Sequence, residues 1–260
     1  MKKTLEKVLV LGGTGFVGRH VCEKFSRQNI HITVPTRRRS NAQHVQSLPM
    51  LDVLEVNIHD PAALSALVAG HDAVVNLVAV LHGDDAAFER VHVDLPKKLA
   101  AACQQTGVTR VVHVSALGAA LDAPSMYQRS KARGEAALQA AGLDLTILRP
   151  SVIFGADDKF LNLFAKLQAV FPFMPLAGAS SKFQPVWVED VADAVVHCLV
   201  RPVAGHTALA LPRIIEACGP DVFTLKELVQ IAARIAGVNE GRGRAVPASF
   251  DDLQCPRRSN

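Results

Sequence analysis

The 260-residue sequence predicts an α/β fold in which a doubly wound parallel sheet is joined to a small C-terminal lobe. Apolar runs of strand length recur through its first half, and they alternate with segments of helical periodicity. The runs are apolar at consecutive positions, so both faces of each strand are expected to be covered by helices, as in parallel sheets. Hydrophobic residues make up 49% of the chain, which is enough for a sizeable core.

The expected strands and helices follow one another in alternation along the chain. We predict strands at residues 7–11, 30–35, 51–57, 73–78, 110–114 and 143–148. We predict helices at residues 17–28, 61–69, 85–106 and 127–141. Gly107 and Gly142 follow the last two helices, at the place where a left-handed residue commonly ends a helix.

The first strand runs directly into a glycine-rich turn with the sequence GGTGFVG, which then opens a helix. Its first glycine permits the tight turn, the third lets backbone N–H groups approach a pyrophosphate, and the last lets the helix pack closely on the strand. The helix N-terminus also favours an anion. The pattern predicts a Rossmann-type dinucleotide site, with these expected contacts: Gly12, Thr14, Gly15, Phe16, Val17 and Gly18.

Three arginines that begin at Arg37 follow the second strand, where an NAD-selective protein places an acidic residue. A guanidinium group suits a ribose 2′-phosphate, because its planar fork pairs with phosphate oxygens. NADP(H) is therefore favoured and NAD(H) stays open, with Arg37 and Arg38 as expected contacts; the alternative is a solvated basic loop. Asn57 and Ile58, which follow the third strand, are expected to lie against the adenine.

Three side chains predict hydride-transfer chemistry. Ser115 follows the fifth strand, at the carboxyl edge where open α/β sheets bind ligands. Tyr127 and Lys131 are four residues apart, which places both on one helix face. A cation beside a phenol lowers its pKa from about 10, so Tyr127 can exchange a proton with a carbonyl or alcohol oxygen that Ser115 also hydrogen-bonds. Lys131 would hold the nicotinamide ribose as well. The alternative is that Tyr127 and Lys131 are an ordinary pair on a surface helix and that Ser115 is a residue type common after a strand.

The sequence pattern changes after Pro150. Segments 157–170 and 187–200 have helical patterns, 171–182 is rich in Pro, Gly and Ser, and 214–218 is expected to be a late strand. We therefore divide the chain into a dinucleotide-binding domain, residues 1–150, and a mixed segment, residues 151–239. The mixed segment forms a small substrate lobe and returns to the main sheet. Residues 240–260 are expected to be a loosely structured tail.

Composition excludes several classes of function. A net charge of +4 with one Trp and one Tyr does not indicate a nucleic-acid binder. The five cysteines form no C-x-x-C pair, and the histidines at 82, 92, 113 and 197 lack metal-ligand spacing, so no metal is expected and these histidines are assigned to packing or the surface. The N-terminal apolar run is too short for a signal peptide, which predicts a cytoplasmic protein. The apolar segment 160–176, interrupted by prolines, leaves peripheral contact with the inner membrane open.

The glycine turn, Ser115 and the string Tyr127-Gln-Arg-Ser-Lys131 together resemble the extended short-chain dehydrogenase/reductase superfamily, also called NAD-dependent epimerases/dehydratases, over residues 5 to about 235. Three longer strings, VHVSALGA (112–119), LRPSVIFGADDKFLNLFA (148–165) and FQPVWVEDVADAV (183–195), resemble the nucleotide-binding accessory subunit of respiratory complex I and its bacterial relatives. The resemblance implies that the glycines, Arg37 and Lys131 contact NADP(H) under a C-terminal lobe. It also implies a lining of the nicotinamide site by Asn76, Leu77, Pro150 and Val152.

Three functions are consistent with these observations. The first is an NADP(H)-dependent oxidoreductase or epimerase-type enzyme that acts on a small, apolar, quinone-like substrate. The second is an NADP(H)-binding subunit or sensor without turnover, associated with a respiratory or quinone-related complex, whose segment 160–176 docks on a partner or membrane; the resemblance implies this role in mitochondria. A nucleotide-sugar epimerase ranks last, because the lobe offers mainly Phe, Leu, Ala and Pro. The substrate, the reaction direction and the oligomeric state stay open.

Overall fold

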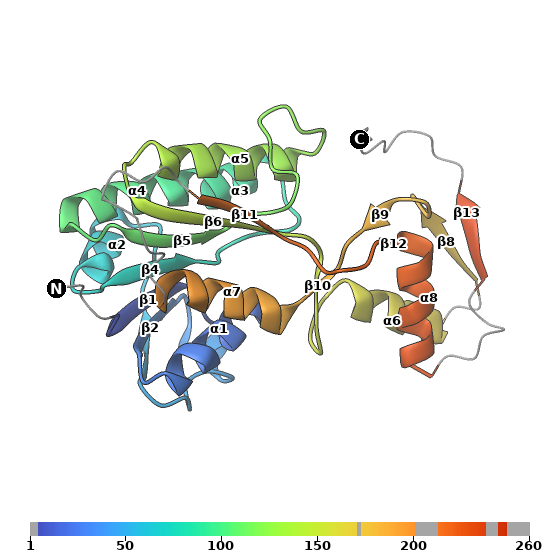
Figure 1. Ribbon diagram of the computed structural model, residues 1–260, viewed down its shortest axis with the longest axis horizontal. Helices are drawn as coiled ribbons and strands as arrows, with labels where there is room; N and C mark the ends of the chain where they lie inside the picture. The colour runs from blue at the N-terminus through green and yellow to red at the C-terminus, as the bar shows by residue number, and fades with distance from the viewer. Residues whose placement is uncertain (1–4, 171–172, 201–212, 238–243, 249–260) are drawn as a thin grey trace. The chain divides into compact units, whose positions relative to one another are not determined.

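The computed structural model describes residues 5–170, 173–200, 213–237 and 244–248 (Figure 1). The chain divides into two units: residues 1–150 with 189–217, and residues 151–188 with 218–260. The mixed segment of the sequence analysis is therefore shared, since its stretch 189–217 belongs to the first unit.

The first unit contains a seven-stranded parallel sheet. Its strands are β1 (Lys7–Leu11), β2 (His31–Thr36), β3 (Leu51–Glu55), β4 (Ala73–Asn76), β5 (Arg110–Val114), β6 (Asp144–Pro150) and β11 (Arg213–Ala217). They lie in the order β11-β6-β5-β4-β1-β2-β3, and every neighbouring pair is parallel. Because the order reverses direction at β1, the sheet is doubly wound and the predicted fold class is confirmed.

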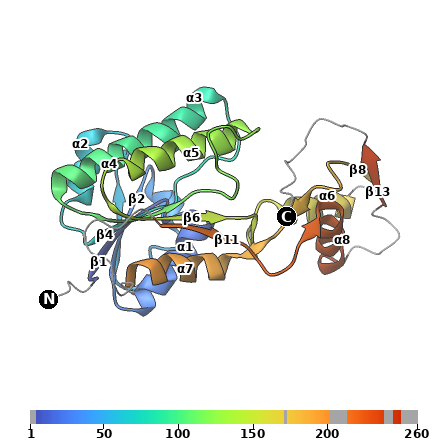
Figure 2. The ribbon, with the colours of Figure 1, turned by 45° about the horizontal axis from the view of Figure 1, so that its top comes forward.

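Helices cover both faces of this sheet, as Figures 1 and 2 show. One face carries α2 (Pro61–Val68), α4 (Leu95–Thr106) and α5 (Met126–Gln139), and the other carries α1 (Phe16–Arg27) and α7 (Val188–Val200). The residues of β1 alternate between the two sides, because Val8 and Val10 pack with α1 and α7 while Leu9 and Leu11 pack with α2 and α4. Two core clusters therefore sandwich the sheet, as continuous apolar strands predict.

The single helix expected at residues 85–106 is divided into three parts. Helix α3 (Asp85–Phe88) leads into a π-helix (Glu89–Asp94), which continues into α4. Pro96 has no N–H to donate to the carbonyl of His92 four residues earlier, so a regular α-helical bond cannot form at this point. The π-turn accommodates one extra residue, and the apolar periodicity alone does not reveal it. Helix α4 ends at Gly107, whose left-handed φ of 74° confirms the predicted stop.

The described residues of the second unit form short strands and two helices. Its elements are β7 (Ile153–Phe154), α6 (Leu161–Val170), β8 (Phe173–Ala177), β9 (Lys182–Phe183), β10 (Val186–Trp187), β12 (Phe223–Thr224), α8 (Leu225–Ile235) and β13 (Arg244–Ala248). A small core of Leu176, Leu225 and Val229 packs against several phenylalanines. None of the helices in the described ranges is long and apolar enough to cross a membrane.

Two segments of this unit contain more regular structure than their composition predicts. The Pro-, Gly- and Ser-rich stretch includes β8, and residues 244–248 of the expected loose tail form β13, paired in parallel with β8. Pairing between distant segments supplies these backbone hydrogen bonds, and no periodicity within either segment encodes it. The rest of the tail lies outside the described residues.

Candidate functional site

The backbone of the glycine turn after β1 is packed so closely that a Cβ atom would clash at several of its positions. Gly12 has a φ of +85°, and the Gly15 N–H donates to the Gly12 carbonyl oxygen over 3.0 Å. A methyl group at Gly18 would collide with the Gly12 carbonyl oxygen and lie 2.6 Å from the Gly13 Cα. A methyl group at Gly13 would lie 2.7 Å from the Val34 side chain. Gly13 is thus a required member of the turn that the sequence analysis did not single out, although it stands in the same motif.

Helix α1 begins at this turn without a capping side chain. Its N-cap is Gly15, no side chain accepts from its first turn, and that turn contains no acidic residue. Helices α2, α3 and α5, by contrast, are capped by Asp60, Asp84 and Ser125. The N–H groups of Phe16, Val17 and Gly18 at the start of α1 therefore lack the usual acceptor, and the positive end of the helix dipole faces the turn that holds Thr14. An anion can occupy this position.

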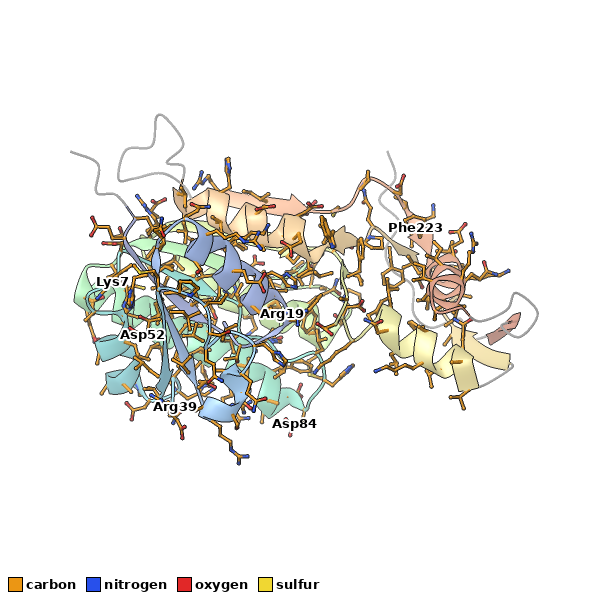
Figure 3. The ribbon with its side chains drawn as sticks, turned by 90° about the horizontal axis from the view of Figure 1, so that it is seen from below. Lys7, Arg19, Arg39, Asp52, Asp84 and Phe223 are labelled. Atoms are coloured by element: carbon orange, nitrogen blue, oxygen red, sulfur yellow. The ribbon has the colours of Figure 1, made fainter. Side chains whose placement is uncertain are left out.

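The ends of β2 and β3 offer basic and neutral groups. Arg37 and Arg38 follow β2 directly and are exposed, whereas Arg39 is held to β3 through its N–H to Glu55, 3.1 Å, and its Nη2 to the Val53 carbonyl oxygen, 3.4 Å. Figure 3 labels Arg39 together with Asp52 of β3. Beyond β3, the Asn57 amide oxygen accepts the His59 N–H, and Ile58 packs against the core.

Lys131 is a buried cation at the carboxyl end of β5. Its side chain belongs to α5, the residue is 1% exposed, and its Nζ donates to the Val114 carbonyl oxygen over 3.1 Å. Burial lowers the pKa of Lys131 to about 8, and the charge of Glu135, one helical turn later, partly opposes that shift. Glu135 in turn pairs through both carboxylate oxygens with Arg149 of β6, at 3.0 and 2.6 Å.

Ser115 lies next to this anchored lysine. Its N–H donates to the Leu148 carbonyl oxygen over 2.7 Å, which fixes its backbone where β5 ends beside β6. The residue is 4% exposed, and its Oγ has no hydrogen-bond partner within the described ranges. A buried hydroxyl without a partner costs free energy unless a ligand atom bonds it.

Tyr127 stands in the first turn of α5, one turn before Lys131. Its ring meets the ring of His92 edge-on at 5.4 Å and the ring of Phe88 at 6.2 Å, both centroid to centroid. Burial raises the pKa of Tyr127 above its usual value, the opposite of the direction expected from a neighbouring lysine. The expectation is wrong for this structure because the Lys131 ammonium is directed to the Val114 carbonyl oxygen and the phenol is packed among rings.

The buried His92 belongs to a hydrogen-bond network behind Tyr127, although its place in the sequence predicted only packing or a surface position. His92 Nε2 accepts the Val80 N–H over 3.1 Å, so Nδ1 carries the hydrogen and donates to the Ser130 hydroxyl over 2.8 Å. That hydroxyl donates to the Tyr127 carbonyl oxygen over 2.8 Å. Burial, followed by the charge of Lys131, lowers the pKa of His92 to about 3. No local sequence signal identifies this role, because all the partners come from other segments.

The comparisons with known proteins decide the family. Residues 8–211 match the NAD dependent epimerase/dehydratase family. The chain belongs to this family. Its seven-stranded sheet and glycine turn are the family's NAD(P)-binding Rossmann fold, and the turn and uncapped helix start fit the pyrophosphate of such a cofactor.

Curated relatives of this chain include mitochondrial and bacterial proteins. The Arabidopsis thaliana protein named NADH dehydrogenase [ubiquinone] 1 alpha subcomplex subunit 9 is 32% identical over 85% of this chain and 56% of its own length. The Mus musculus protein of that name is 33% identical over 85% of this chain and 59% of its own length. A Caulobacter vibrioides ceramide reductase is 30% identical over 88% of this chain and 70% of its own length. The chain thus spans little more than half of the mitochondrial proteins.

Solved structures share the fold. A dTDP-glucose 4,6-dehydratase from Streptomyces venezuelae, solved with NAD, superimposes with a TM-score of 0.77 at 24% identity, over 93% of this chain and 84% of that one. A UDP-glucose 4-epimerase from Thermus thermophilus, in complex with NAD, gives a TM-score of 0.75 at 22% identity, over 95% and 88%. At these identities the likeness concerns the fold alone.

Of the four residues expected to line the nicotinamide site, three belong to the first unit and Val152 belongs to the second. Leu77 packs on the glycine turn, since a methyl group at Gly12 would lie 3.2 Å from the Leu77 carbonyl carbon. The Asn76 amide is engaged with His113 Nδ1, 3.1 Å, and with the Val78 N–H. The Pro150 carbonyl oxygen accepts the Leu117 N–H within the first unit. Val152 belongs to the second unit, where its carbonyl oxygen accepts the N–H of Val186. No cluster of potential metal ligands occurs in the described residues.

Proposed function

We propose that this protein is an NADP(H)-dependent oxidoreductase that transfers a hydride to or from a small, apolar substrate at Ser115, Tyr127 and Lys131. The observation that carries the proposal is the buried, unpartnered hydroxyl of Ser115, next to the carbonyl oxygen that anchors the Lys131 ammonium. Buried polar groups without partners concentrate at sites where a ligand completes the hydrogen bonds. Tyr127 lies one helical turn from Lys131 on α5, and Ser115 directly follows β5, which supports a common site for the three residues at the carboxyl end of that strand.

Each of the three side chains would have a separate role around one substrate oxygen. The bound cofactor supplies or accepts the hydride. Ser115 Oγ–H donates to the substrate carbonyl oxygen and holds it in place. Tyr127 then gives its phenolic proton to that oxygen, and its raised pKa keeps the proton in place at neutral pH until the oxygen becomes basic. Lys131, anchored on the Val114 carbonyl oxygen with a pKa of about 8, would hold the nicotinamide ribose beside this oxygen.

The preference for NADP(H) is supported by the end of β2. Arg37 and Arg38 stand there as exposed cations where an NAD-selective protein needs a carboxylate. Either guanidinium can pair with a 2′-phosphate through two parallel hydrogen bonds.

The substrate class is supported by the relatives' names. The Caulobacter protein is called a ceramide reductase, and the mitochondrial proteins are named as subunits of a ubiquinone-linked dehydrogenase. A lipid-like ketone or a quinone offers the carbonyl oxygen that the three side chains require. We extend the proposal to a cytoplasmic location with peripheral contact to the inner membrane, where such substrates are found.

A second function, a cofactor-binding subunit without turnover, is favoured by one specific observation. The relatives from Arabidopsis and mouse carry the name of a subunit of NADH dehydrogenase rather than of a free-standing enzyme. In this case NADP(H) would stabilise the fold, and association with a respiratory complex would be the role.

One experiment separates the two functions. Purified protein is mixed with NADPH and a panel of quinones and long-chain ketones, and NADPH oxidation is followed by absorbance in wild type, Tyr127→Phe, Ser115→Ala and His44→Gln. His44 is an exposed residue of the first unit and serves as the control. We expect Tyr127→Phe to lose about 10²-fold or more in rate while it binds NADPH normally.

Turnover that is unchanged in Tyr127→Phe would refute the catalytic role. NADPH binding that raises the melting temperature without turnover of any substrate would favour the subunit. Failure of both NADPH and NADH to bind would remove both functions.

A further inference from the structure

His92 is bonded through both nitrogens of its buried ring to two other segments of the chain. Its Nε2 accepts the Val80 N–H over 3.1 Å, and its Nδ1 donates to the hydroxyl of Ser130 on α5 over 2.8 Å. Only the neutral imidazole with its hydrogen on Nδ1 can make both bonds at once. A pKa of about 3 keeps the ring in this neutral form. His92 therefore joins the segment that follows β4 to α5.

The segment that contains Val80 also lies against the glycine turn. A methyl group at Gly12 would lie 3.2 Å from the Leu77 carbonyl carbon. The Leu77 N–H also donates to the Leu11 carbonyl oxygen over 2.9 Å, at the point where β1 ends. The segment from Leu77 to Val80 thus contacts the turn proposed to hold the cofactor pyrophosphate, and it supplies the N–H that is bonded to His92.

The other end of this network contacts Tyr127 at two points. The Ser130 hydroxyl donates to the Tyr127 carbonyl oxygen over 2.8 Å. The Tyr127 ring meets the His92 ring edge-on, at 5.4 Å between centroids and 83° between planes. Such ring contacts are directional, because the positive edge of one aromatic ring faces the negative face of the other. Both the backbone and the ring of Tyr127 therefore depend on contacts with the His92 network.

The backbone around His92 allows a close approach to α5. His92 lies in the π-helix, and π-turns within helices occur frequently at functional sites. At the contact, α5 has Gly134, where a methyl group would collide with the His92 carbonyl oxygen. Glycine is disfavoured inside helices, so its presence at this contact indicates that the close approach is required. Two independent features of the backbone thus determine the position of one side chain.

We propose that His92 is a positioning residue for hydride transfer, and that it fixes Tyr127 relative to the cofactor held at the glycine turn. The inference deepens the proposed function and rests on it. His92 acts through Val80 on one side and through Ser130 on the other. The Tyr127 proton and the hydride must reach neighbouring atoms of one substrate carbonyl, so a displacement of about 1 Å between tyrosine and cofactor costs up to about 100-fold in rate. A hydrogen-bonded connection between the two limits that displacement.

Two conservative variants separate the bonds of His92. In His92→Asn the amide nitrogen lies near the position of Nδ1 and still donates to Ser130, whereas in His92→Gln the amide oxygen lies near the position of Nε2 and still accepts from Val80. Ser130→Ala removes the hydroxyl and keeps both rings. His44→Gln, at an exposed position of the first unit, is the control. Circular dichroism checks that each variant is folded.

The test measures kcat and the KM for NADPH with the quinone or ketone that wild type reduces. The Ser130 bond acts on Tyr127 directly. We therefore expect kcat to fall about tenfold or more in His92→Gln and Ser130→Ala, by less in His92→Asn, and not in His44→Gln, with KM within about twofold of wild type. In the Ser130→Ala background, His92→Asn and His92→Gln should give equal kcat, because the bond that distinguishes them is lost. A difference that persists there, an unchanged kcat in His92→Gln and Ser130→Ala, or a rise in KM without a fall in kcat would overturn the inference.

A second measurement does not depend on turnover. Tyr127 is the chain's one tyrosine, so fluorotyrosine incorporated during expression gives one fluorine NMR resonance that reports on its ring. We expect a single narrow line in wild type and His44→Gln, and a broadened or divided line in Ser130→Ala and His92→Gln. The same narrow line in all four proteins would overturn the inference. If wild type reduces no substrate, the proposed function fails on its own, and this resonance alone decides whether His92 positions Tyr127.

Discussion

Replacement of Gly134 by alanine tests the close contact that positions His92 against Tyr127. Gly134 lies within α5, and a methyl group there would collide with the His92 carbonyl oxygen and lie 3.2 Å from Pro96 Cγ. Helix propensity alone predicts that Gly134→Ala stabilises the protein by about 1 kcal/mol. The collision is with backbone and a proline ring, neither of which can rotate away, so the overpacking cost of about 1–3 kcal/mol should exceed that gain.

The net expectation is a lower free energy of unfolding, measured by urea titration followed by circular dichroism, and a melting temperature lower by about 2–4 °C per kcal/mol. Ala136→Gly is the matched control, since Ala136 is exposed on the same helix and its substitution should cost about 1 kcal/mol through propensity alone. If Gly134→Ala stabilises the protein by about as much as Ala136→Gly destabilises it, the close contact does not exist and the reasoning is refuted.

Three further predictions concern buried charge. His92, whose pKa is about 3, stays neutral when folded, and so does His113, whose burial lowers its pKa well below the usual range. The unfolded chain binds protons at these residues below about pH 6.5, so the free energy of unfolding should fall as pH decreases from there toward 3, by up to about 1.4 kcal/mol per pH unit for each histidine. Urea titrations between neutral and mildly acidic pH should show a shallower slope in His92→Gln, and an unchanged slope would contradict the assignment. Tyr127 is the chain's one tyrosine, so the near-ultraviolet absorbance of tyrosinate should titrate in a single step above about pH 10 while circular dichroism still shows a folded protein; a lower midpoint would mean that lysine outweighs burial. Glu135→Gln should cost about 3 kcal/mol in urea unfolding, because it leaves the Arg149 guanidinium without its bidentate partner, and a loss below about 0.5 kcal/mol would show that the pair is screened like a surface ion pair.

Local patterns predicted the strands and the turn with little error. The first and fifth strands, Lys7–Leu11 and Arg110–Val114, agree with the prediction at both ends. Their residues are apolar on both faces, and this property depends only on the strand's own sequence. The third strand ends at Glu55, two residues earlier than expected, because the chain beyond it turns toward α2. The end of a strand thus depends on the path of the next segment, which the strand's own apolar pattern does not contain.

The sequence predicted the residue types of the candidate site but not the surroundings of their side chains. These residue types followed from spacing along one helix and one strand end. The structure adds that the Lys131 ammonium donates to the Val114 carbonyl oxygen and that the Ser115 hydroxyl has no partner in the described residues. The role of His92 could not be predicted, since it depends on groups from several segments of the first unit. The pairing of β11 with β6 at the edge of the main sheet was expected only in outline, because strand pairing at a sheet edge is a long-range contact.

The sequence by itself determined the doubly wound sheet, the glycine turn and the candidate residues, because periodicity, backbone freedom and side-chain type are local properties. Tertiary structure alone decided which side chains are desolvated and what surrounds them. It reversed the expected direction of the Tyr127 pKa, lowered the pKa of Lys131 to about 8, and left the hydroxyl of Ser115 without a partner in the described part of the chain. The physical reason is that desolvation and electrostatic interaction depend on distance in space, and residues far apart in the chain contribute most of both.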